Sequence, residues 1–79
     1  MQLRYARHAL ERCSERGVTK AEVEECVRNA TSIFKTQKGN NQYRAVVGGR
    51  RLKVVVAGDR DTADEKFVVT VIVEDDDGS

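Results

Sequence analysis

The first thirty residues place apolar side chains three and four positions apart, which is the spacing of one face of an α-helix. Between residues 6 and 16 the members of this apolar stripe are Ala6, Ala9, Leu10 and Cys13. Gly17 follows the stripe, and glycine is typical of the position after the last turn of a helix. The pattern therefore predicts a first helix over residues 6–16 with one side facing the core.

A second helix is predicted directly afterwards by its start signal. Thr19 and Glu22 have the spacing of a capping box, in which each side chain accepts a hydrogen bond from the other residue's amide. Val18 and Val23 flank this box as a hydrophobic staple. The apolar face then consists of Val23, Cys26, Val27 and Ala30. We expect this helix to end near residue 29 and to complete one side of the core.

Beyond residue 30 the pattern changes to that of β-strands, and nine of the twelve valines lie after residue 45. Four strands are predicted, at residues 31–36, 42–47, 52–57 and 67–73. Gly48 and Gly49 form a tight hairpin signal between the second and third of these strands, and a polar loop is expected at residues 58–65. Connections this short favour antiparallel neighbours.

Alternation assigns the strand side chains to two faces. One face is wholly apolar and should receive both helices; its members are Leu52, Val54, Val56, Phe67, Val69, Val71 and Val73. The opposite face is mixed, with Gln42, Arg44, Val46, Lys53, Val55, Val68, Thr70 and Ile72. The chain is thus predicted to be an α+β domain with two N-terminal helices packed on one face of a four-stranded antiparallel sheet. The mixed face is interpreted as a solvated surface, a shallow anion site or a homodimer interface.

With 79 residues the chain has room for one small domain, which we place at residues 1–73. Leu, Ile, Val and Phe make up 19 of the 79 residues, which argues against a wholly disordered chain. The sequence has no apolar run long enough for a transmembrane helix and no signal-peptide core at its N-terminus. We therefore expect a cytoplasmic protein without membrane contact. The acidic segment 74–79 is predicted to be a disordered tail.

The net charge of +1 hides an uneven distribution. Residues 1–58 contain 12 Lys or Arg and 5 Asp or Glu, whereas residues 59–79 contain 2 and 8. This asymmetry indicates a polyanion-binding surface beside an acidic tail, or basic residues that only keep exposed strands soluble. The tail is either a solvated end or an internal mimic of RNA on the basic face. The few aromatic residues argue against base stacking, since only Tyr5 and Tyr43 are expected to be exposed.

The two cysteines, Cys13 and Cys26, fall on the apolar helix faces. Buried free thiols behave there as small hydrophobic groups. Together with a single histidine they do not have the ligand number or spacing of a structural zinc site. We therefore expect neither a metal nor another cofactor.

The first predicted helix also carries a polar flank, whose members are Tyr5, His8, Arg12 and Arg16. A histidine that titrates near neutrality beside two fixed positive charges has the parts needed to cleave a phosphodiester. These parts are a proton shuttle and groups that stabilise charge on phosphate. In the alternative interpretation His8 is simply exposed, and the two arginines pair with Glu11 or Glu15.

Several of these residues form a motif that resembles a bacterial and archaeal family, domain of unknown function family 4258. The motif residues are His8, Ala9, Arg12, Arg16, Gly17, Val18, Thr19, Glu22 and Val23. The resemblance continues to Val68-Val69-Thr70-Val71 and covers roughly residues 5–73. Such domains resemble the RelE and ParE toxins and the wider Barnase, EndoU, colicin and RelE ribonuclease fold. The resemblance implies helices followed by an antiparallel sheet, and a small RNA-cleaving or ribosome-associated domain.

The resemblance also implies roles for individual residues. The matched positions are His8, Arg12 and Arg16 on the helix and, by strand position only, Arg44, Lys53 and Thr70. A Ser or Thr often caps the family's first helix two places before the histidine. Ala6 stands at that place here, and the missing cap should cost about 1 kcal/mol.

Three functions are compatible with these residues. The first is a metal-independent ribonuclease toxin with RNA's 2′-hydroxyl as nucleophile; its predicted catalytic residues are His8, Arg12, Arg16 and Thr70. The cations predicted to hold phosphate or RNA are Arg44, Lys53, Arg50 and Arg51. The second is a non-catalytic module that binds nucleic acid or protein through the same surface. The third is a toxin-like scaffold whose partner is an antitoxin or a second copy of the chain.

Overall fold

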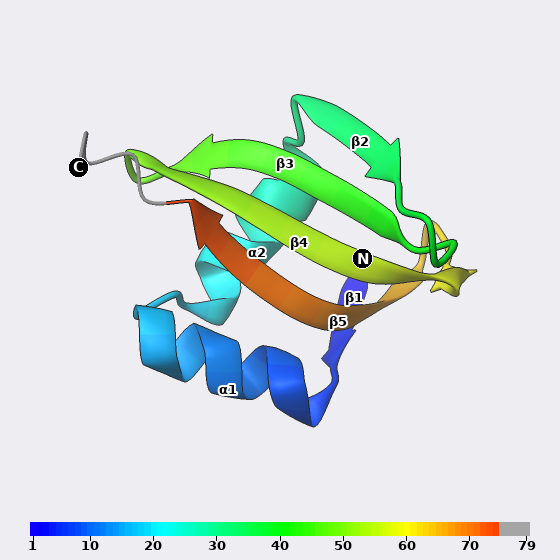
Figure 1. Cartoon of the computed structure of the whole chain (residues 1–79), viewed down its shortest axis with the longest axis horizontal. Coiled ribbons are helices and arrows are strands. Elements are labelled where there is room, and N and C mark those ends of the chain that lie inside the picture. The colour runs from blue at the N-terminus through cyan, green and yellow to red at the C-terminus, as the bar shows by residue number, and fades with distance from the viewer. Residues whose placement is uncertain (75–79) are drawn as a thin grey trace.

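The computed structural model describes residues 1–74, which form two helices and a five-stranded sheet (Figure 1). The elements in chain order are β1 (Gln2–Tyr5), α1 (Arg7–Arg16), α2 (Lys20–Arg28), β2 (Ser32–Lys35), β3 (Asn41–Val47), β4 (Arg50–Asp61) and β5 (Glu65–Glu74). On one side of the sheet α2 packs against β3 and β4, and α1 packs against β5. We call the other side, which no helix of residues 1–74 covers, the open face. The predicted α+β class is confirmed.

The sheet has one strand more than predicted, and it is not wholly antiparallel. Its order is β1-β5-β4-β3-β2, in which β1 pairs parallel to β5 and the other neighbours are antiparallel. The prediction of four antiparallel strands is therefore wrong in number, and wrong in orientation at this edge. Leu3 and Tyr5 of β1 pack against the core. Tyr5 consequently does not belong to the polar flank of the first helix.

The helix ends follow the predicted signals. Gly17 ends α1 in the left-handed conformation, with a φ of 66°, and its amide donates to the carbonyl oxygen of Cys13. Thr19 and Glu22 form the predicted capping box at the start of α2. Ala6 is the N-cap residue of α1 and supplies no side-chain hydrogen bond, as expected from the missing Ser or Thr.

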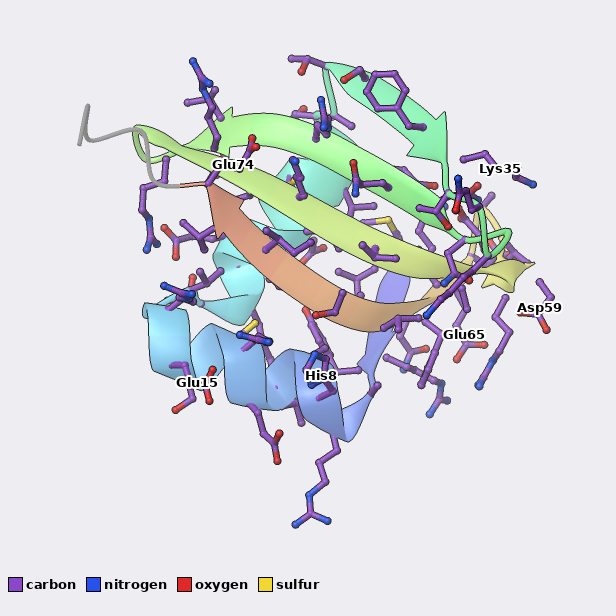
Figure 2. All side chains as sticks on the ribbon, in the orientation of Figure 1. His8, Glu15, Lys35, Asp59, Glu65 and Glu74 are labelled. Carbon is purple, nitrogen blue, oxygen red and sulfur yellow. The ribbon has the colours of Figure 1, made fainter. Side chains whose placement is uncertain are left out.

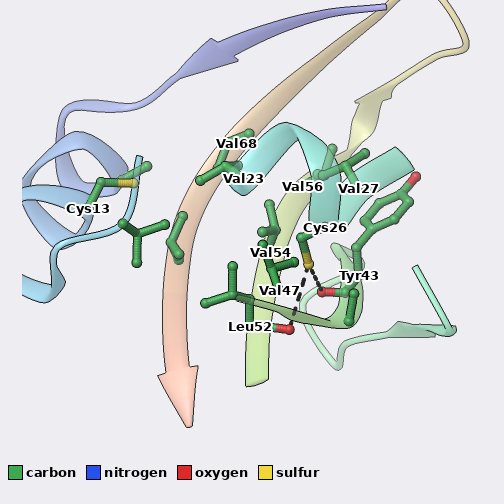
Figure 3. Close-up of a cluster of buried hydrophobic side chains, with 14 residues drawn as sticks. Cys13, Val23, Cys26, Val27, Tyr43, Val47, Leu52, Val54, Val56 and Val68 are labelled. Carbon is green, nitrogen blue, oxygen red and sulfur yellow. Dashed lines mark hydrogen bonds between the residues drawn. The ribbon is translucent and has the colours of Figure 1, made fainter. Parts of the chain in front are cut away.

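The core lies between the helices and the sheet (Figure 3). Leu52, Val54 and Val56 project into it from β4 and are fully buried, as predicted. The thiol of Cys26 lies 3.6 Å from the carbonyl oxygen of Tyr43, and burial raises the pKa of this thiol to about 11. Both cysteines are free and buried, which confirms their predicted state.

A bulge in β5 changes the predicted faces of that strand. The register between β4 and β5 shifts after Val55, and Val56 pairs with Val68, so Val69 is an extra residue. Val68 is fully buried in the core, contrary to its predicted place on the mixed face. Phe67 alternates with it and lies on the open face, contrary to its predicted place in the core.

The ends of the last two strands also differ from prediction. β4 continues through most of the expected polar loop, and only residues 62–64 separate it from β5. Glu74 is the last residue of β5 rather than the first residue of a tail. The rest of the predicted acidic tail, residues 75–79, lies outside the described residues. Neither helix of residues 1–74 is long and apolar enough to cross a bilayer.

Candidate functional site

A groove of about 280 Å³ lies between α1 and the second half of β5. Arg12 and Arg16 of α1 line one side of it, and residues 70–73 of β5 line the other. The fold thus brings together three of the four predicted catalytic residues, Arg12, Arg16 and Thr70, although Thr70 is far from both arginines in the sequence.

The groove exists because β1 covers only the first half of β5. β1 pairs with residues 65–68, and the amide of Ala6 then donates to the carbonyl oxygen of Val68 at 2.9 Å. The chain continues along the same edge of β5 as α1 (Figure 1). A helix with its side chains is about 10–12 Å across, whereas neighbouring strands lie about 4.8 Å apart. The change from strand to helix therefore leaves room beside the strand edge.

The two groove arginines differ in their partners. The guanidinium of Arg12 lies 3.7 Å from the carboxylate of Glu15, and exposed pairs of this kind contribute little to stability. The side chain of Arg16 is exposed and makes no hydrogen bond or ion pair within residues 1–74. The alternative interpretation, in which both arginines pair with neighbouring glutamates, therefore holds for Arg12 alone among the described residues. Arg16 can turn toward an anion without breaking a contact.

His8 lies one helical turn before Arg12, on the flank of α1 that is turned toward β5 (Figure 2). Its side chain is exposed and has no hydrogen-bond or ion-pair partner in the described part of the chain. It does not line the groove, so the fold places it next to the arginines and outside their cavity. Tyr5, the fourth member of the predicted flank, lies in β1, where burial raises its pKa to about 12.

A row of side chains crosses the open face beside the groove. Arg44 lies opposite Lys53 in the register of the sheet, and Lys53 lies opposite Ile72, which lines the groove. Neighbouring strands are about 4.8 Å apart, so Lys53 is one strand from the groove and Arg44 is two. The Lys53 ammonium is 2.9 Å from a carboxylate oxygen of Glu74. The guanidinium of Arg44 lies over the ring of Phe34, 4.8 Å from its centre.

The other two predicted phosphate ligands are placed on different sides of the sheet. Arg50 lies on the helix side. It donates to the carbonyl oxygens of Arg16 at 3.0 Å and Gly17 at 3.1 Å, and to the carboxylate of Glu22 at 3.2 Å. These bonds join the end of α1 and the start of α2 to the sheet, so the fold itself occupies Arg50. Arg51, the next residue, lies on the open face.

Apolar side chains remain exposed between the cations of the open face. They are Phe34, Val46 and Ile72. Val55 lies on the same face but is buried, because its neighbours on both adjacent strands cover it. A homodimer interface on this face stays a prediction, and so does a protein partner such as an antitoxin.

A second arginine–phenylalanine stack, which the sequence pattern did not predict, lies at the opposite end of the open face. Arg60 lies over the ring of Phe67 at 4.2 Å, and Arg4 pairs with Glu65 beside it. These residues line a smaller hollow of about 160 Å³. The charged composition of residues 58–65 is typical of a loop, which concealed the strand that carries Arg60.

A polar cluster on the helix side of the sheet was also missed. Lys66 forms an ion pair with Asp61, which accepts hydrogen bonds from the Tyr43 hydroxyl at 2.6 Å and the Asn41 amide at 2.7 Å. Burial alone would raise the pKa of Asp61, but these hydrogen bonds outweigh it and lower that pKa. The four groups satisfy one another, so we interpret the cluster as structural.

Residues 1–74 contain no group of three or more His, Cys, Asp or Glu side chains placed to hold a metal ion. Among known proteins, no curated sequence and no solved structure shows a significant match to the chain. The family model described as Domain of unknown function (DUF4258) matches residues 5–73, which include both sides of the groove and the cation row. The chain therefore belongs to the DUF4258 family.

Proposed function

We propose that this chain binds RNA and holds phosphate groups in the groove between α1 and β5. The observation that carries the proposal is the meeting of Arg12, Arg16 and Thr70 around one groove. Arginine presents a planar fork of N–H donors that fits phosphate oxygens, and a threonine hydroxyl adds another donor. A groove lined by two guanidinium groups, one of them without a partner in residues 1–74, favours an anionic ligand.

The cations of the open face extend this surface beyond a single phosphate. Lys53 lies one strand away from the groove, and Arg44 lies two strands away. Arg4 and Arg60 lie at the opposite end of the same face. A distribution of this kind fits a chain of negative charges better than it fits one small anion.

An exposed aromatic ring favours nucleic acid over other polyanions. Phe34 is 49% exposed, and its ring is stacked with the guanidinium of Arg44. Unpaired RNA bases stack on such rings and on arginine planes. The expectation that only Tyr5 and Tyr43 are exposed is wrong, because Tyr43 is buried in the core and Phe34 lies on an edge strand. The small number of aromatic residues therefore argues less strongly against base stacking than the sequence suggested.

Removing both groove cations is expected to weaken RNA binding strongly. We expect Arg12→Gln/Arg16→Gln to raise the dissociation constant for a single-stranded RNA of about 12 nucleotides by roughly tenfold. The slope of log K against log salt should become shallower by about 1.4, since each single-strand phosphate contact contributes about 0.7. Fluorescence anisotropy with labelled RNA at several salt concentrations measures both quantities.

The matched control is Arg7→Gln/Arg28→Gln, which removes two charges from exposed helix positions away from the groove. We expect this variant to change the dissociation constant by less than about threefold. Equal losses in the two double variants would show that only net charge matters. Binding by the wild type that is flat between low and moderate salt would contradict phosphate contacts altogether.

RNA cleavage is a second candidate, favoured by the position of His8 one turn from Arg12 on the groove side of α1. The resemblance to RelE and ParE toxins implies the same chemistry. In such a reaction the 2′-hydroxyl attacks the adjacent phosphorus, the 5′-oxygen leaves, and a 2′,3′-cyclic phosphate forms. His8 would move the proton, while Arg12 and Arg16 would stabilise the added negative charge.

If the chain cleaves RNA, His8 should be needed for cleavage and not for binding. We expect the purified chain to cleave RNA in EDTA, and His8→Ala to reduce the rate about 100-fold or more while binding is unchanged. Gel analysis of labelled RNA, with anisotropy on the same samples, measures both. Cleavage that survives the substitution would remove His8 from the mechanism, and no cleavage by the wild type would leave RNA binding alone.

A further inference from the structure

The carboxylate of Glu74 lies among cations on the open face. It is 2.9 Å from the Lys53 ammonium, and Glu74 lies directly opposite Arg51 in the sheet register. Lys53 in turn lies opposite Arg44 on the next strand. One carboxylate at the end of β5 therefore lies beside two cations of β4, and β3 places a third cation next to Lys53.

All three cations act on this carboxylate. The hydrogen bond from Lys53 lowers the pKa of Glu74 most, burial opposes it, and the charges of Lys53, Arg44 and Arg51 lower the pKa further, so that the net shift is downward. A field that favours one anion at this position favours another anion there as well. The side chain of Lys53 is 17% exposed and that of Glu74 is 45% exposed, so the cation is the better held of the two.

We propose that Lys53, Arg44 and Arg51 form a second anion site, which the Glu74 carboxylate occupies in the free chain and an RNA phosphate takes over on binding. This inference rests on the proposed RNA binding and adds its regulation, since the chain competes with RNA for its own cations. Phosphate carries more acceptor oxygens than a carboxylate, so it can replace Glu74 and keep every cation paired. The Glu74 carboxylate is 45% exposed and can return to water when a phosphate replaces it at Lys53, so the exchange leaves neither charge unpaired and buried.

The second site is continuous with the groove. Ile72 lines the groove and lies opposite Lys53 in the sheet, so about 4.8 Å separates the two strands that carry them. An RNA strand that places one phosphate between Arg12 and Arg16 can therefore bring a neighbouring phosphate to Lys53. Because the two sites are continuous, the Glu74 carboxylate competes for these cations with the same RNA strand that occupies the groove, and not with a ligand bound elsewhere.

The first test uses a small anion, whose binding to the cations does not depend on recognition of an RNA chain. Inorganic pyrophosphate is titrated into the full chain and into Glu74→Gln, and NMR shifts of Lys53 and Arg44 report on the site. We expect Glu74→Gln to bind pyrophosphate about fivefold more tightly at these residues. The control Glu24→Gln removes the same charge from α2, where Glu24 pairs with Arg28, and should behave as the wild type. Equal affinities in the two variants overturn the inference.

The same variants are then compared with the single-stranded RNA. We expect Glu74→Gln to bind it about fivefold more tightly and Glu24→Gln less than about twofold. Tighter pyrophosphate binding without tighter RNA binding overturns the inference, while RNA binding that depends on Arg12 and Arg16 still supports the proposed function. If neither the wild type nor any variant binds RNA, the proposed function is wrong, and so is the competition between Glu74 and RNA.

Discussion

Replacing Lys66 with methionine is expected to lower the free energy of unfolding by about 3 kcal/mol. The side chains of Lys66 and Asp61 are 13% and 7% exposed, and they form an ion pair across the β4–β5 hairpin. Methionine fills much of the same volume but leaves the Asp61 carboxylate buried without its counter-charge. The hydrogen bonds from Tyr43 and Asn41 remain, and they keep the loss below that of an isolated buried charge.

The stability that this pair contributes depends on pH in two directions. Hydrogen bonds outweigh burial and lower the folded pKa of Asp61, so its contribution is present above the unfolded value of about 3.9 and is lost as pH falls through the folded pKa. Burial alone would lower the pKa of Lys66, but the bonds to Asp61 and Tyr43 raise it. Its contribution is therefore present below about 10.4 and is lost as pH rises through the folded pKa.

Urea unfolding monitored by circular dichroism measures this effect. The difference in the free energy of unfolding between wild type and Lys66→Met should be constant near neutral pH and should become smaller in acid below about pH 4. Lys38→Met, at an exposed turn position, is the control and should change stability by no more than about 0.5 kcal/mol. A loss as small as that of the control in Lys66→Met would show that the pair is not a stabilising part of the fold.

Replacing Gly58 with alanine is expected to cost about 2–3 kcal/mol. A Cβ at this position would lie 1.9 Å from the carbonyl oxygen of Gly39. Because the clash is with backbone, no side-chain rotation relieves it, and the turn between β2 and β3 must move away from β4. That movement also stretches the hydrogen bond that the Gly58 amide donates to the Asn40 side chain.

The control for this substitution is Gly39→Ala on the other side of the same contact. Gly39 has a φ of 85°, but an added Cβ meets no atom within 4 Å. Gly39→Ala should therefore lower the free energy of unfolding only by the cost of a left-handed backbone conformation for alanine, about 1 kcal/mol. Denaturant unfolding of both variants separates the two causes. Equal losses would show that the close approach at Gly58 does not limit the packing of the turn.

The helix ends were predicted well because their signals are local, whereas Leu10 of the predicted core-facing stripe is 41% exposed. The capping box of Thr19 and Glu22 needs residues only three apart, and Gly17 acts on the turn that precedes it. The burial of Val23, Cys26 and Val27 follows from one helical period. These features depend on no distant partner, so the sequence alone was sufficient to predict them.

The parallel edge strand could not be predicted in the same way. β1 has four residues, in which Leu3 and Tyr5 alternate with polar positions, and so short an alternation also fits the lead-in to a helix. Its partner lies some sixty positions away in β5. The bulge at Val69 is similar, since alternation assigns faces only while the register is unbroken.

The candidate site was predicted in part, for the same physical reason. Helical spacing places Arg12 and Arg16 on one flank of α1, but the meeting of that flank with Thr70 depends on where β1 ends. Arg50 and Arg51 are adjacent and equally charged, yet alternation sends them to opposite sides of the sheet. Charge counting therefore indicated a basic surface without showing which cations share it.

An NMR titration of the uniformly labelled chain with single-stranded RNA tests most directly whether the groove between α1 and β5 binds phosphate. We expect the largest shifts at Arg12, Arg16 and residues 70–73, and smaller ones at Lys53 and Arg44. The residues that line a separate hollow along α2 should hardly shift; they are Ala21, Glu24, Glu25, Arg28 and Asn29. Shifts centred on α2, or spread evenly over both sides of the sheet, would contradict the groove as the RNA-binding site.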